Sequence, residues 1–160
     1  MTFLSDFFCN FRNAWIFPHC LSTSKSVEVM KFDVSNWSSG IFLDPKIKPS
    51  RLDDPNRSNK SFEREILVQC FPLYSVLMAL DNPHIDYCSL DIEGAEAAIL
   101  KTVPWNQVNV TLFSVEINHA GKIFPESRVD IQEFMKKQGY KFHSTVVIDD
   151  IFYKKEINRF

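Results

Sequence analysis

The sequence predicts an α/β fold, because a buried strand runs directly into a helix near its middle. Residues 85–92 form an apolar run with small polar interruptions, which is typical of a strand buried on both faces. Residues 93–103 are rich in helix formers, and Pro104 ends the helix that they predict. Glu93 and Glu96 are expected in its first turn and Lys101 in its last, as the helix dipole favours. Ligands of open α/β sheets bind just beyond the carboxyl ends of such strands.

The elements before this unit follow from alternation and from proline and glycine signals. Short strands are predicted at 14–17 and 66–70, an alternating strand at 27–34, its hairpin partner at 40–43, and a helix at 73–80 behind Pro72. Residues 44–61 are rich in proline, serine and charged side chains and predict a long polar loop, for which a surface insertion without chemistry is favoured over a lid or a spacer.

The elements after Pro104 complete the alternation of strands and helices. A second buried strand is predicted at 110–118, and a capping-box-like start at 127–130 precedes a helix that Gly139 ends. Two strands, 141–148 and 151–155, are expected to pair through a turn at Asp149 and Asp150.

Composition excludes some classes of function. A length of 160 residues fits one domain, and a formal net charge of −2 provides no footprint for nucleic acid. The longest uncharged run, 66–80, is too short to span a bilayer, so no transmembrane segment is expected.

Buried free thiols are favoured over two disulfides for the four cysteines, Cys9, Cys20, Cys70 and Cys88. Glycan acceptor triplets begin at Asn36, Asn56, Asn59 and Asn109, so a cytoplasmic and a lumenal location both stay open.

Polar side chains gather at the predicted carboxyl ends of the two buried strands. The candidate catalytic residues are Asp91, Glu93, Glu116, Asn118 and His119. A carboxylate or an imidazole there can take the proton of a hydroxyl, and His119 is the best single general base. No metal site is predicted, although Asp91 and Glu93 are the residues that would hold a divalent ion. Glu96 is expected to complement the helix dipole, whereas a buried Glu116 needs a partner or a ligand.

Several linked motifs resemble one known family. IDYCSLDIEGAEAAILKTVPW and FSVEINHAG, together with RNAWIFPHCLS, VQCFPLYSVLMAL and VDIQEFMKKQGYKFHSTVVIDDIFYKK, resemble the FkbM methyltransferase domain and, within it, an animal Star-like subgroup. The resemblance covers residues 12–155 and leaves 1–11 unassigned and 156–160 as a tail. It implies an incomplete Rossmann-like methyltransferase sheet, mostly parallel, with terminal antiparallel strands and flanking helices.

The resemblance also implies a cofactor, S-adenosylmethionine, with Cys20, Leu21 and Ser22 near its adenine. It implies O-methyl transfer to a small or glycan-like acceptor. The sequence has four isolated glycines and no glycine-rich turn, so we expect an N-terminally truncated domain that lacks its first two strands and binds the cofactor weakly or not at all. The alternative is a Star-like, non-enzymatic module that assists the traffic of membrane-protein cargo through the secretory or endosomal pathway.

Overall fold

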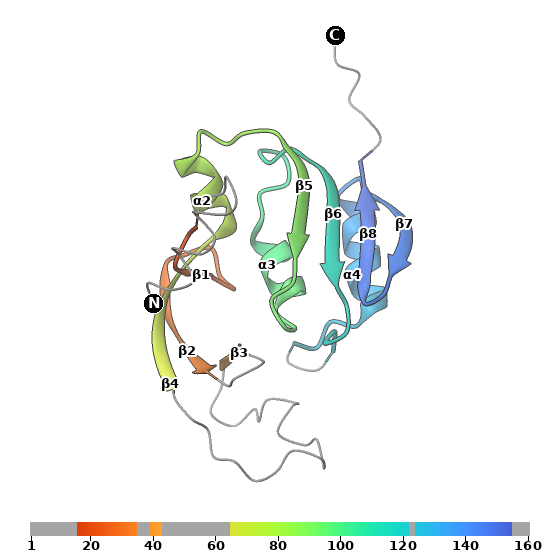
Figure 1. Cartoon of the computed structure of the whole chain (residues 1–160). Coiled ribbons are helices and arrows are strands. Elements are labelled where there is room, and N and C mark those ends of the chain that lie inside the picture. Colours follow the sequence, from red (N-terminus) through yellow and green to blue (C-terminus); the bar gives the residue numbers. More distant parts are fainter. Residues whose placement is uncertain (1–15, 35–38, 43–64, 122–123, 155–160) are drawn as a thin grey trace, which may run out of the picture.

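The computed structural model of the chain describes residues 16–34, 39–42, 65–121 and 124–154, and it contains two separate four-stranded sheets (Figure 1). The first sheet has the order β1-β4-β2-β3, from β1 (Cys20–Leu21), β2 (Glu28–Val34), β3 (Ser39–Phe42) and β4 (Glu65–Phe71). The second has the order β5-β6-β8-β7, from β5 (Ile85–Leu90), β6 (Val110–Glu116), β7 (Lys141–Val146) and β8 (Asp149–Tyr153). The described helices are α2 (Leu73–Ala79), α3 (Glu96–Thr102) and α4 (Arg128–Lys137).

The α/β class is confirmed, but the mostly parallel sheet is not what the structure shows. In the part of the chain that it describes, only β1 with β4 and β5 with β6 pair in parallel. The other pairings are antiparallel, because two hairpins, β2–β3 and β7–β8, supply half of the strands and β4 returns antiparallel onto β2. The antiparallel pair predicted at the end of the chain is confirmed by β7 and β8.

The first strand lies later in the sequence than predicted. Ala14 and Trp15 fall outside the described residues, and Ile16 and Phe17 are not in a strand. The strand is instead β1, where Cys20 and Leu21 pair with Cys70 and Phe71 of β4. The preceding segment packs against the same strand, since the rings of Phe17 and His19 meet that of Phe71 edge to face, with centroid distances of 5.6 and 5.1 Å.

The prediction of free thiols was wrong for two of the four cysteines. Cys20 and Cys70 form a disulfide that links the paired strands β1 and β4. Cys88 is free and half-buried on β5, and burial raises the pKa of its thiol to about 11. Cys9 lies outside the described residues, as do the segments 1–11, 44–61 and 156–160 named above.

The main hydrophobic core lies between the second sheet and its helices. It combines Phe113 and Val115 of β6 with Ile99 and Leu100 of α3 and Met135 of α4, all buried. A smaller cluster of Met30, Cys70 and Ala95 joins the first sheet to the start of α3. The loop that enters α3 is therefore supported from both sheets, and Ile92 packs against both clusters.

The C-terminal hairpin turns two residues earlier than predicted. The structure places the turn at Val147 and Ile148, while Asp149 and Asp150 belong to β8. The two acids look like turn residues in the sequence, but Asp150 is fully buried and Asp149 accepts a hydrogen bond from Ser114 at 2.9 Å. The predicted capping box at the start of α4 is confirmed.

None of the helices within the described ranges is long and apolar enough to span a membrane.

Candidate functional site

The turn between β5 and α3 holds its acidic residues in a fixed arrangement. Glu93 adopts a left-handed backbone conformation with φ of 63°, and Gly94 follows with φ of 109°. The helix begins only at Glu96, so the placement of Glu93 in its first turn was wrong. Glu96 is buried and accepts hydrogen bonds from the backbone N–H groups of Ile92 at 2.9 Å and Gly94 at 3.1 Å. The Glu96 side chain thus stabilises the backbone of the turn. The Glu93 side chain takes no part in these two hydrogen bonds and lies beside neighbouring residues.

The end of β6 meets this turn. Leu90 pairs with Val115 in the parallel register, so the next residues along each strand, Asp91 and Glu116, are neighbours at the carboxyl edge of the sheet. His119 lies three residues beyond Glu116, and its Nδ1 is 3.1 Å from Glu116 Oε1. The same Nδ1 is 3.3 Å from Glu93 Oε2. The predicted meeting of acids and imidazole at this edge is present in the structure.

Glu116 is the most unusual member of the group. Its side chain is 3% exposed, and Oε2 has no hydrogen-bond partner among the described residues. Burial raises the pKa of Glu116 to about 7, and the nearby carboxylates of Asp91, Glu96 and Glu93 add to the rise. Burial also raises the pKa of Glu96, although the hydrogen bonds that its carboxylate accepts from backbone N–H groups lower the pKa in part. A carboxyl group of this kind can hold or release a proton near neutral pH.

The other candidates differ in exposure. Asp91 and Asn118 are exposed, His119 is buried, and Glu93 is 31% exposed. The donor atoms of Glu93, Glu116 and His119 all lie within 4.8 Å of one another, which makes them the group able to share an ion. The sequence had instead indicated Asp91 and Glu93 as the residues that would hold a divalent ion. The spacing of Glu116 and His119 by three residues after a strand was the signal for the group that the structure forms.

The residues assigned to the cofactor lie in β1 and directly after it. Cys20 is in the disulfide, and Leu21 packs against the main core. Ser22 is fully buried, and its Oγ lies 2.8 Å from the carbonyl oxygen of Ser26 and 2.5 Å from Glu28 Oε1. Ser22 is therefore engaged within the protein, whereas Cys20 and Leu21 are only partly buried, and their place near an adenine stays a prediction.

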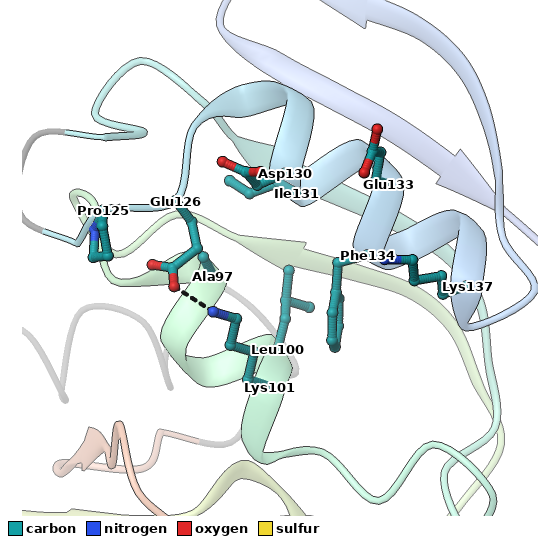
Figure 2. Close-up of a pocket in the computed structure, with 10 residues that line it drawn as sticks. All are labelled: Ala97, Leu100, Lys101, Pro125, Glu126, Asp130, Ile131, Glu133, Phe134 and Lys137. Carbon is teal, nitrogen blue, oxygen red and sulfur yellow. Dashed lines mark hydrogen bonds and ion pairs between the residues drawn. The ribbon is translucent and has the colours of Figure 1, made fainter.

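A groove elsewhere in the molecule is separate from the carboxylate group. It has a volume of about 390 Å³ and lies between α3 and α4, where Figure 2 shows the Lys101–Glu126 ion pair at its rim. Its lining mixes the apolar side chains of Leu100 and Phe134 with charges of both signs. It shares no residue with the group at the strand ends, and its mixed charge indicates no ligand class.

Replacing Glu116 is expected to stabilise the protein at alkaline pH. The pKa of Glu116 is about 7 in the folded chain against a usual 4.5, so between these values the folded state binds more protons and stability falls as pH rises. In protein freed of divalent ions, Glu116→Gln should gain about 1–3 kcal/mol over the wild type at pH 8 and little at pH 4. Denaturant unfolding at both pH values measures this. Glu133→Gln, at an exposed position on α4, should show no such pH-dependent difference.

One comparison with known proteins gave a match. The family model described as "Methyltransferase FkbM domain" matches residues 17–142, which is most of the chain. The comparisons with curated proteins and with solved structures gave no significant match. The matched range includes β1 to β6 and every residue of the Glu93, Glu116 and His119 group. This chain therefore belongs to the FkbM methyltransferase domain family.

Proposed function

We propose that this chain provides the acceptor side of a methyltransferase that acts on a hydroxyl group of a small or glycan-like molecule. The observation that carries the proposal is the contact of His119 with Glu116 and Glu93 at the carboxyl edge of β5 and β6. Family membership supports methyl transfer as the reaction class. A hydroxyl acceptor is inferred because a hydroxyl must lose its proton when it is methylated, and this group is built to receive one.

The chain's own residues would act by positioning and by proton transfer. His119 Nδ1 is held between two carboxylates, which fixes the orientation of its ring. The exposed Asp91, beside Glu116, is placed to orient the polar groups of an acceptor. Positioned general bases of this kind typically contribute about 10²–10⁴-fold to a rate.

Cofactor binding by this chain is expected to be weak. S-adenosylmethionine is the methyl donor that the family implies, but the Ser22 side chain is buried and bonded within the protein, and no glycine-rich turn is present in the sequence. We expect calorimetric titration to give a Kd weaker than about 1 mM. Micromolar binding would show that other residues of the chain form the donor site.

The reaction itself is tested with the cofactor in excess. The chain is incubated with millimolar S-adenosylmethionine that carries a labelled methyl group and with a panel of polyols and monosaccharides, and labelled ethers are measured by mass spectrometry. His119→Ala should lower the rate at least ~100-fold, since it removes the base. His143→Ala, on the exposed part of β7, is the matched control and should leave the rate unchanged. Transfer that is insensitive to His119→Ala would contradict the proposed base.

A second candidate function is the Star-like, non-enzymatic module for membrane-protein cargo in the secretory pathway. The Cys20–Cys70 disulfide favours it, because disulfides persist in oxidising compartments. The acceptor triplets at Asn36, Asn56 and Asn59 lie outside the described residues, and Asn109 is exposed just before β6. Absence of methyl transfer to every acceptor, in protein whose disulfide is intact, would favour this function over catalysis.

A further inference from the structure

The three donor atoms of Glu93, Glu116 and His119 are arranged like part of a metal coordination sphere. His119 Nδ1 lies 3.1 Å from Glu116 Oε1 and 3.3 Å from Glu93 Oε2. In a tetrahedral zinc site, metal–ligand distances of ~2.1 Å separate neighbouring ligand atoms by about 3.4 Å. The two separations from His119 therefore match a zinc site, and the donor atoms of Glu93 and Glu116 lie within 4.8 Å of each other.

An independent feature of Glu116 also indicates a missing ligand. Its side chain is only 3% exposed, Oε2 has no hydrogen-bond donor among the described residues, and the Asp91 side chain that interacts with this carboxyl group is itself a carboxylate. A buried carboxylate oxygen without a partner is costly in free energy, and folded proteins rarely leave one. A cation bound by this carboxyl group would satisfy it.

We propose that Glu93, Glu116 and His119 bind a divalent transition-metal ion, with Zn²⁺ as the preferred ion. One imidazole nitrogen and two carboxylate oxygens suit Zn²⁺ better than Mg²⁺, which prefers oxygen ligands and near-octahedral geometry. Three protein ligands leave a fourth tetrahedral position open, as in catalytic zinc sites. The partial exposure of Glu93 provides access from solvent, because its side chain is 31% exposed.

The role of the ion rests on the proposed function, although its binding does not. Asp91 is exposed at the same edge of the sheet, so an acceptor hydroxyl there would be able to reach a bound ion. A hydroxyl bound to Zn²⁺ would lose its proton to water more readily, because the ion would stabilise the alkoxide. His119 would then serve as a metal ligand instead of a general base, and its replacement would affect metal binding as well as transfer.

Calorimetric titration with Zn²⁺ tests the site, using the chain with its Cys20–Cys70 disulfide intact and without cofactor or acceptor. One ion per chain is expected, with a Kd on the order of 10 µM or tighter, and Mg²⁺ should bind at least tenfold more weakly. Glu93→Gln and His119→Ala should each weaken Zn²⁺ binding at least tenfold. The matched controls, Glu133→Gln and His143→Ala, should leave it unchanged, since both residues are exposed and belong to α4 and β7.

The outcomes separate this proposal from the proposed function. Because Glu93 is partly exposed, Glu93→Gln should stay folded even if His119→Ala does not, and circular dichroism checks both variants. Absence of Zn²⁺ binding, or binding that neither variant weakens, overturns the metal site while leaving His119 as a base. Zn²⁺ binding without methyl transfer to any acceptor supports the site and counts against the enzyme.

Discussion

Removal of the Cys20–Cys70 disulfide is expected to lower the free energy of unfolding by about 4 kcal/mol. The bond joins residues separated by 50 positions, and closing a loop of this length in the unfolded chain removes that much conformational freedom. The effect should also reach the site. Cys70 packs with Met30 and Ala95, and Ala95 immediately precedes α3, so loosening β1 and β4 weakens the support of the acidic turn.

Denaturant unfolding of a Cys20→Ser/Cys70→Ser variant measures this loss against the oxidised wild type. Reducing the wild type should bring its midpoint close to that of the double variant. Cys88→Ala is the control, because Cys88 is free and half-buried, and it should cost only about 1 kcal/mol. A loss below about 1 kcal/mol in the double variant would show that the first sheet is held by its hydrogen bonds and packing alone.

The parts of the fold that sequence patterns predicted are those with strong local signals. The strand at 85–92, the helix that Pro104 stops and the capping box at Ser127 all depend on neighbouring residues, and the structure contains each of them. The division into two sheets depends on β4 returning to β2 across a long intervening segment. No local pattern reports a pairing of that kind, and the same is true of a disulfide between distant cysteines.

The candidate site was predictable to a similar extent. Adjacent parallel strands bring their carboxyl ends together, so the meeting of Asp91 and Glu116 followed from two strand assignments. The left-handed backbone at Glu93 did not follow, because such a conformation is rare for a residue other than glycine, asparagine or aspartate. That conformation turns a residue expected in the helix into a neighbour of His119. The choice of Glu93, Glu116 and His119 over Asp91 therefore required the structure.

Asp150 shows how a turn-like residue can instead organise the interior, and its partner Arg128 gives the second large expected effect. Asp150 is fully buried and accepts hydrogen bonds from Arg128 Nη2 at 2.9 Å, Arg128 Nε at 3.1 Å and Gln132 Nε2 at 2.7 Å. Thr145 Oγ1 donates a further bond at 2.8 Å. These contacts join α4 to β7 and β8.

Arg128→Ala should lower the free energy of unfolding by about 3 kcal/mol, because it leaves a buried carboxylate without its cation. The value lies at the lower end for buried pairs, since the Arg128 side chain is 45% exposed and Gln132 and Thr145 still bond to Asp150. Urea unfolding measures the loss. As a control, Lys101→Ala breaks the more exposed pair with Glu126 and should cost less than ~1 kcal/mol.

A double-mutant cycle isolates the interaction between the two charges. Arg128→Ala combined with Asp150→Asn should cost less than the sum of the single changes, because a neutral amide in place of the carboxylate no longer needs a cation. Additive losses would mean that the two charges do not interact in the folded protein. The helix α4 would then be held to the hairpin by its buried apolar residues Ile131 and Met135 and by the hydrogen bond from Gln132 to Asp150.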